Sequence, residues 1–266
     1  MKGEIIYKLQ LYYKDEYIRL FQGDCLQVMD KLIEKGIKFD AIIADIPYGT
    51  TACKWDTIIP LDKMWNKINQ LIKNSKMVGL FAQEPFASVL RMSNIKNYKH
   101  EWYWNKEVAG NFVQAKNHPL KVIENIIVFS NNKIGYMPIM EEAKEENKRP
   151  RGQIYSQKTD FLGKVSQGDF KCSNNHNEDL RYPKNLITFN ARMGDCNNVN
   201  RVHPTQKPVD LIEYFINTYT NENDLILDFT CGSGTTLLAA RNLKRKCIGI
   251  ELEEKYCEIA KNRLIA

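Results

Sequence analysis

Short hydrophobic runs alternate with segments in which hydrophobic residues recur at helical spacing. Runs of four to nine residues predict strands, and they lie at residues 18–21, 39–44, 77–82, 100–106, 122–130, 225–228 and 246–251. Hydrophobic residues spaced three and four apart predict helices, at residues 25–32, 61–72, 85–92, 211–219, 234–243 and 253–264. Strands that alternate with helices are typical of a doubly wound α/β fold. We therefore expect a mostly parallel, seven-stranded sheet.

The predicted strands at 100–106 and 122–130 have no helical pattern between them. Without a crossover helix, two such strands must pair antiparallel if they pair at all. The first contains Trp102, Tyr103 and Trp104, which either alternate in burial or form a platform for stacked bases. We favour alternating burial.

Residues 131–200 have no sustained periodicity and are rich in Asn, Lys, Gly and Ser. So long a stretch is unusual in a compact domain unless it is functional, and we interpret it as an inserted module or a set of binding loops. From Lys148 to Lys207, eleven Lys and Arg oppose five Asp and Glu, an excess equal to the net charge of +6 of the whole chain. A polyanionic partner fits this excess, and a solvated basic surface stays open. The candidates for phosphate contacts are Arg149, Arg151, Lys158, Lys164, Lys171, Arg181, Lys184 and Arg192.

Composition excludes several classes of protein. A hydrophobic fraction of 43% in 266 residues supplies an ordinary globular core. No apolar stretch reaches the roughly 18 residues that cross a bilayer, and the first residues lack a signal pattern. We therefore expect an intracellular, cytoplasmic protein, or a nuclear one in a eukaryote, without a membrane partner. The seven cysteines and four histidines are dispersed, so neither a disulfide framework nor a metal site is expected.

Residues 39–50 carry the first candidate chemistry. A buried-strand pattern ends at Asp45 and is followed by Ile46, Pro47, Tyr48 and Gly49. Open α/β sheets bind ligands at the carboxyl ends of their strands, so a carboxylate and an aromatic ring there indicate a site. The alternative is a plain strand and turn.

Residues 225–236 carry the second stretch of candidate chemistry. An apolar strand ends at Asp228, and Gly232 and Gly234 precede a helix, where the backbone can approach a ligand closely. The Gly-Lys-Ser/Thr ending of a P-loop is missing. The next strand ends at Glu251, 17 residues beyond Gly234, the usual placing of a carboxylate that receives ribose hydroxyls. Together these features favour a nucleoside-bearing cofactor over a tight turn followed by a helix-start acid.

The two stretches resemble motifs of one family. Asp45 to Tyr48 is similar to the Asp-Pro-Pro-Tyr signature of amino-methylating DNA methyltransferases, and Asp228 to Thr235 resembles their S-adenosylmethionine loop. The catalytic signature precedes the cofactor loop, a permuted order typical of their β group, and residues 203–208 resemble the segment before that loop. The likeness covers roughly residues 17–130 and 201–264. The sequence departs from the family at Ile46, usually Pro, and at Thr230, usually Phe.

The resemblance implies a Rossmann-like methyltransferase sheet with one antiparallel strand. It divides the chain into a catalytic half (1–130), a target-recognition insertion (131–200) and a cofactor-binding half of the same domain (201–266). The implied substrate is double-stranded DNA, methylated at N6 of a flipped adenine, and a homodimer is expected. N4 of cytosine, a catalytically silent DNA-binding subunit and RNA as substrate remain open.

The resemblance also implies the roles of individual residues. Asp45 and the Ile46 carbonyl would accept the hydrogens of the target amine, Pro47 would keep Ile46 extended, and Tyr48 would stack on the base. Asp24 would meet the cofactor's adenine, Glu251 its ribose, and Lys207 its carboxylate. The full set implied for S-adenosylmethionine is Asp24, Cys25, Thr205, Gln206, Lys207, Asp228, Thr230, Cys231, Gly232, Ser233, Gly234, Thr235, Glu251 and Leu252.

Overall fold

The computed structural model describes residues 10–49, 56–143, 179–192, 196 and 206–266. The chain divides into two compact units, one of residues 1–137 and 185–266 and one of residues 138–184. In the smaller unit, the short strands β7 (Glu141–Glu142) and β8 (Leu180–Arg181) pair antiparallel. The elements described below belong to the larger unit.

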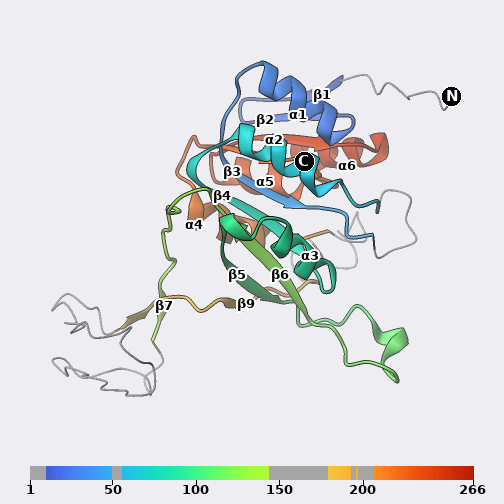
Figure 1. The fold of residues 1–266 in the computed structure, drawn as a ribbon, viewed down its shortest axis with the longest axis vertical. Coiled ribbons are helices and arrows are strands. Elements are labelled where there is room, and N and C mark those ends of the chain that lie inside the picture. Colours follow the sequence, from blue (N-terminus) through green and yellow to red (C-terminus); the bar gives the residue numbers. More distant parts are fainter. Residues whose placement is uncertain (1–9, 50–55, 144–178, 193–195, 197–205) are drawn as a thin grey trace. The chain divides into compact units, whose positions relative to one another are not determined.

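The larger unit is built on a sheet that has nine strands within the described residues, in the order β1-β2-β11-β10-β3-β4-β6-β5-β9 (Figure 1). Strands β2, β11, β10, β3 and β4 run parallel. Strand β6 is antiparallel to both of its neighbours, and β1 is antiparallel to β2. The strand bounds are β1 Gln10–Lys14, β2 Ile18–Gln22, β3 Phe39–Asp45, β4 Ile72–Ala82, β5 Tyr98–Asn105, β6 Ile123–Phe129, β9 Leu186–Thr188, β10 Leu225–Asp228 and β11 Lys246–Glu251.

All seven predicted strands lie in this sheet, but the expected count of seven, with one antiparallel strand, is too low. The additional strands β1 and β9 form its two edges. Edge strands need no continuous hydrophobic run because they have a neighbour on one side only. Accordingly β1 buries no residue fully and β9 buries only Ile187. Because β9 joins the large sheet, that sheet includes part of the stretch predicted to be an insertion.

Helices cover both faces of the sheet (Figure 1). Helices α1 (Cys25–Glu34), α2 (Leu61–Leu71) and α3 (Phe86–Ser93) share one hydrophobic core with the sheet. Helices α4 (Val209–Tyr219), α5 (Thr235–Asn242) and α6 (Glu254–Ile265) share the other. Strand β3 contributes to both cores, because alternate side chains of a strand point to opposite faces.

Two sequence predictions about local structure have clear outcomes. Trp102 and Trp104 are buried and Tyr103 is half-buried, so alternating burial on β5 is confirmed. Ile72, predicted as the end of a helix, is instead the first residue of β4 and has extended backbone angles. Its helical spacing arises because both elements bury residues in the same core.

The strand directions determine where the site lies. The carboxyl ends of β2, β11, β10 and β3 meet at one edge, where Glu251 pairs with Gln22 and Asp228 with Gly249. Strand β6 runs the other way, so its first residues, including Glu124, lie at that same edge. None of the helices in the described part of the chain is long and apolar enough to span a membrane.

Two glycines with left-handed backbone separate the cost of backbone strain from the cost of close packing. At Gly234 (φ +77°), an added Cβ would lie 2.8 Å from the Cβ of Ala260 in α6, whereas at Gly36 (φ +66°) it would meet nothing within 4 Å. Left-handed strain should make Gly36→Ala cost about 1 kcal/mol of unfolding free energy. Overpacking should raise the cost of Gly234→Ala to about 3 kcal/mol. Urea unfolding of both variants measures this difference, and equal costs would contradict the packing described.

Candidate functional site

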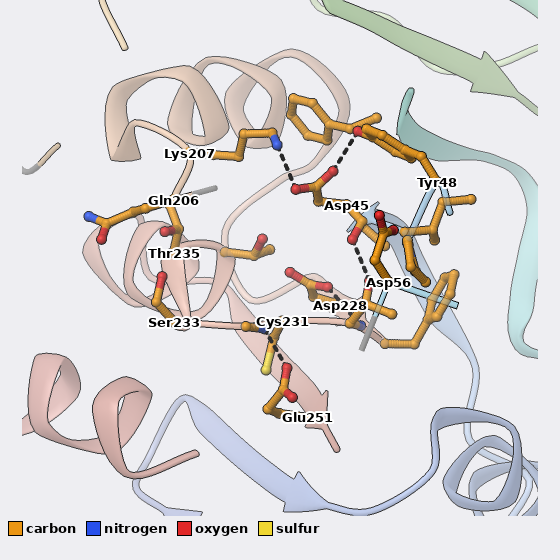
Figure 2. Close-up of a pocket in the computed structure, with 18 of the residues that line it drawn as sticks. Asp45, Tyr48, Asp56, Gln206, Lys207, Asp228, Cys231, Ser233, Thr235 and Glu251 are labelled. Carbon is orange, nitrogen blue, oxygen red and sulfur yellow. Dashed lines mark hydrogen bonds and ion pairs between the residues drawn. The ribbon is translucent and has the colours of Figure 1, made fainter. Parts of the chain in front are cut away.

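A cavity of about 620 Å³ lies at the carboxyl edge of the sheet (Figure 2). Most of the residues predicted for the site line it: Asp24, Cys25, Asp45, Ile46, Pro47, Tyr48, Gln206, Lys207, Asp228, Thr230, Cys231, Gly232, Ser233, Thr235, Glu251 and Leu252. Two do not join this set. Gly234 is not part of the lining and packs against Ala260 instead, and Thr205 lies outside the described residues.

Asp45, the last residue of β3, is held through both of its carboxylate oxygens. The Tyr48 hydroxyl donates to Oδ1 at 2.6 Å, and Lys207 Nζ donates to Oδ2 at 2.5 Å. Figure 2 shows Lys207, Asp45 and Tyr48 in a row along one side of the cavity. Each carboxylate oxygen has a further lone pair, so Asp45 is oriented and still able to accept hydrogen bonds from a ligand.

Glu124, on β6, joins this row and was not found from the sequence. Its carboxylate lies 3.1 Å from Lys207 Nζ and 3.6 Å from Lys106 Nζ, and it accepts a hydrogen bond from Tyr48 at 3.2 Å. The Glu124 side chain is only 7% exposed. A carboxylate is rarely buried unless it is paired. The one available signal was therefore this single charge near the start of a mostly apolar run.

The charges in this row determine the protonation of its members. Burial acts to lower the pKa of Lys207, but the carboxylates of Asp45 and Glu124 outweigh burial and raise it above its ordinary value. Burial and the same two carboxylates raise the pKa of Tyr48 well above its usual range. Lys207 therefore stays an ammonium ion and Tyr48 a neutral phenol at physiological pH.

The segment after Asp45 is fixed by packing. The side chain of Ile46 is buried in the core, at 2% exposure, so its backbone is the part best placed to serve a ligand. The Tyr48 ring stacks on Phe86, with ring centroids 5.6 Å apart and planes inclined by 28°. The Gly49 N–H donates to Asp56 at 2.8 Å, an anchor that no motif indicated.

The loop after β10 connects the two predicted motifs. The Thr230 hydroxyl donates to the backbone carbonyl of Asp45 at 3.1 Å, and the Thr230 N–H donates to Asp228 Oδ1 at 3.1 Å. Thr230 stands where the resembled family usually has Phe. In this chain that departure supplies a hydrogen bond from the glycine loop to the backbone of the catalytic signature.

Glu251, at the end of β11, supports the other side of the same loop. Its carboxylate accepts the N–H groups of Gly232 at 2.9 Å and Glu253 at 2.8 Å. Behind the loop, Arg263 of α6 donates to the Ser233 carbonyl at 2.7 Å and to the Thr235 hydroxyl at 3.1 Å. The backbone of the loop is therefore fixed from both sides.

Asp24 is the N-cap of α1 and accepts the Gln27 N–H at 3.0 Å. It also lines the cavity, so Asp24 caps the helix and is in place to meet a ligand. Burial raises the pKa of the Cys25 thiol to about 12 and that of the Cys231 thiol well above its usual range. Both thiols therefore stay protonated, which makes them poor nucleophiles.

The cavity is rich in carboxylates. Burial raises the pKa of Asp228 to about 7 against the opposing hydrogen bonds from Thr236 and Thr230, and the charges of Asp45 and Glu251 add to the rise. Burial also raises the pKa of Glu251. A ligand with a positive charge would relieve the repulsion among these groups.

The basic residues proposed for phosphate contacts are only partly within the described structure. Arg192 is exposed and lines the cavity. Arg181 and Lys184 belong to the smaller compact unit. The others, Arg149, Arg151, Lys158, Lys164 and Lys171, lie outside the described residues.

Known proteins match most of the chain. A model of the N6/N4 methyltransferase family, described as DNA methylase, matches residues 39–262. Type II methyltransferase M2.MboI of Moraxella bovis is 26% identical over 262 residues, which cover 94% of this chain and 88% of that protein. Type II methyltransferase M2.LlaDCHI of Lactococcus lactis subsp. cremoris is 55% identical over 62 residues, 23% of either chain. The matches to M2.LlaDCHI and to M.HpaI of Haemophilus parainfluenzae span about a quarter of those relatives, 23% and 26%.

Solved structures share the fold. The M1.HpyAVI–SAM complex has a TM-score of 0.63 at 24% identity, covering 94% of this chain and all (100%) of that one. The cytosine-N4-specific PvuII DNA methyltransferase also has a TM-score of 0.63, at 16% identity, covering 96% of this chain and 89% of that one. At these identities the likeness shows the fold alone.

The raised pKa of Asp228 predicts a pH dependence of stability. Between the unfolded pKa near 4 and the folded pKa of about 7, the folded state binds the proton and the unfolded state does not, so stability falls as pH rises. Asp228→Asn, neutral at every pH, removes this loss. The unfolding free energy of Asp228→Asn minus that of the wild type should therefore rise by about 3 kcal/mol from pH 5 to pH 8. Urea titrations at several pH values measure it, and a flat difference would refute the assignment.

Proposed function

This chain belongs to the N6/N4 family of DNA methylases, and from that premise we propose that it transfers a methyl group from S-adenosylmethionine to N6 of an adenine flipped out of double-stranded DNA. The observation that carries the proposal is the pair of donors on Asp45. Lys207 and Tyr48 orient this carboxylate in the same cavity as the glycine loop. A partly buried carboxylate held this way suits the activation of an amine, because its orientation is set before the substrate arrives.

The cavity residues fit S-adenosylmethionine. The cavity volume of about 620 Å³ lies within the range of small-molecule sites, and Asp228 and Glu251 supply negative charge for a sulfonium ion. The cofactor, when bound, supplies an electrophilic methyl group on a positively charged sulfur. The residues that would hold it are Asp24, Cys25, Thr205, Gln206, Asp228, Glu251, Leu252 and the loop from Thr230 to Thr235.

Asp45 and Ile46 act on the target amine. An exocyclic amine is a poor nucleophile because its lone pair is delocalised into the base. The Asp45 carboxylate and the Ile46 backbone carbonyl accept hydrogen bonds from its two N–H groups. These hydrogen bonds localise the lone pair on nitrogen. The localised lone pair would then take up the methyl group that the bound cofactor supplies, and the electron pair of the broken carbon–sulfur bond would stay on the departing thioether. The surplus proton on nitrogen passes to Asp45 and on to solvent.

Lys207 and Glu124 act through Asp45. Lys207 donates to one oxygen of the Asp45 carboxylate and so holds its orientation toward the amine. Glu124 gives the ammonium a second carboxylate, so Lys207 stays in place when the amine competes for Asp45. Tyr48 presents its ring to the flipped base while Phe86 supports it from the other side.

The choice of adenine rests on Asp45, since the resemblance associates Asp at this position with adenine enzymes and Ser with cytosine enzymes. Transfer to N4 of cytosine uses the same geometry and is the first alternative. A catalytically silent DNA-binding subunit is the second, and the oriented Asp45 argues against it. We also propose that the motifs follow the permuted order, that residues 131–200 recognise the target sequence, and that the chain forms a homodimer.

Asp45→Asn should abolish most methyl transfer, because an amide accepts hydrogen bonds less strongly and carries no negative charge. We expect a loss of about 100-fold or more in kcat, with affinity for S-adenosylmethionine within about threefold of the wild type. Transfer of labelled methyl to DNA and calorimetric titration of the cofactor measure the two quantities. Asp62→Asn, at an exposed carboxyl of α2, is the matched control. Retained transfer in Asp45→Asn would disprove the role of Asp45.

Glu124→Gln should lower kcat by about tenfold while the KM for cofactor changes little, because it leaves Lys207 with a single carboxylate. The effect should be smaller when Lys207 is already replaced by Gln, since the two residues act on Asp45 together. A double-mutant cycle on kcat tests the coupling. Additive losses would show that Glu124 acts independently of Lys207.

A further inference from the structure

The segment between β5 and β6, residues 106–122, forms an arm that reaches away from the sheet (Figure 1). The arm begins at the site, because Lys106, Val108, Ala109 and Gly110 line the catalytic cavity. Its outer part takes no part in the chemistry proposed above. Because the arm lies beside the cavity, it is a candidate surface for contact with the molecule that carries the target base.

The arm has an internal structure of its own. Asn111 closes its base, since Asn111 Oδ1 accepts the Lys121 N–H at 2.7 Å and Asn111 Nδ2 donates to the Pro119 carbonyl at 3.1 Å. A short 3₁₀ turn, Phe112–Gln114, follows, and the Ala115 N–H donates to the Phe112 carbonyl at 3.1 Å. Phe112 and Val113 are therefore presented on a defined turn.

These two side chains face solvent. Phe112 is 69% exposed and Val113 84%, the highest value among the large hydrophobic residues that the structure describes. Single exposed hydrophobic residues need no explanation, but two adjacent ones on a projecting turn beside a cavity suggest insertion into a partner. The patch is too small for a stable protein–protein interface, which buries about 800 Å² on each side.

The charges on the arm match a nucleic acid. Its sequence contains three lysines, Lys106, Lys116 and Lys121, and one acid, Glu107. Glu107 accepts a hydrogen bond from Asn190 at 3.0 Å. Lys106 pairs with Glu124, whereas Lys116 and Lys121, which follow the turn in the chain, are exposed. Two apolar side chains followed by two exposed cations fit a duplex, where wedges enter between bases and lysines contact phosphates.

We infer that Phe112 and Val113 insert into the DNA beside the target and fill the space that the flipped base leaves, while Lys116 and Lys121 hold the adjacent phosphates. This inference rests on the proposed function and adds to it the element that opens the duplex. Extrusion of a base costs a few kcal/mol of lost pairing and stacking. A wedge that replaces the base in the stack recovers part of that cost, so the arm matters most when the target is paired.

The test compares two duplexes that contain the recognition sequence, found beforehand by mapping modified bases in DNA from cells that express the chain. In one, the target adenine is paired with thymine. In the other, it faces an abasic site and is already unpaired. On the paired duplex, Phe112→Ala/Val113→Ala should lower kcat/KM by about 10- to 100-fold. On the abasic duplex, it should stay within about threefold of the wild type. Met92→Ala, which removes a side chain of similar exposure (68%) on α3, should change neither rate.

Three outcomes would overturn the inference. These are an equal loss on both duplexes, no loss on the paired duplex, and a change of oligomeric state in sedimentation, which would place the arm between two copies of the chain. Absence of transfer by the wild type on both duplexes would instead refute the proposed function.

Binding to the paired duplex tests the arm separately. Lys116→Gln/Lys121→Gln should reduce the slope of log affinity against log salt by about 2, and an unchanged slope counts against phosphate contacts.

Discussion

A largely buried lysine between two carboxylates is the interaction on which the site depends. Lys207 lies 2.5 Å from Asp45 and 3.1 Å from Glu124, and thereby connects the segment before α4 to β3 and β6. A buried charge that loses its partner is strongly destabilising, so each member of the row holds the others in place. The pairing also keeps the Asp45 carboxylate oriented before any substrate binds. Orientation in advance is what catalysis by positioning requires.

Topology places these groups together. Five parallel strands end at one edge and bring Asp24, Asp45, Asp228 and Glu251 around a single cavity. The antiparallel direction of β6 brings the start of that strand, and so Glu124, to the same edge. The hydrogen bond from Thr230 to the Asp45 carbonyl then connects the glycine loop to β3. The loop proposed to hold the cofactor and the carboxylate proposed to activate the amine are thus parts of one hydrogen-bonded structure.

The sequence predicted the parts of the molecule that depend on local pattern. Buried strands such as β3 are continuous hydrophobic runs, and Asp45 and Asp228 end such runs, so their place at the edge followed from the fold class. Pairings between distant segments have no such local pattern. The contact of Lys207 with Asp45 spans 162 positions, and Glu124 is one charge in an apolar run. The edge strands β1 and β9 were not predicted, because a strand that pairs on one side only needs no continuous hydrophobic run. Close packing also has no local pattern: the sequence did not indicate that a Cβ at Gly234 would lie 2.8 Å from the Cβ of Ala260 in α6.

The identity of the methylated nucleoside decides whether Asp45 activates an adenine amine. Duplex DNA treated with the purified chain and labelled S-adenosylmethionine is digested to nucleosides, and the labelled product is identified by chromatography and mass. We expect N6-methyladenine from the wild type and none from Asp45→Asn. Label in N4-methylcytosine would contradict the assignment of the base, and no label at all from a wild-type chain that binds both cofactor and DNA would contradict the assignment of Asp45 as the group that activates the amine.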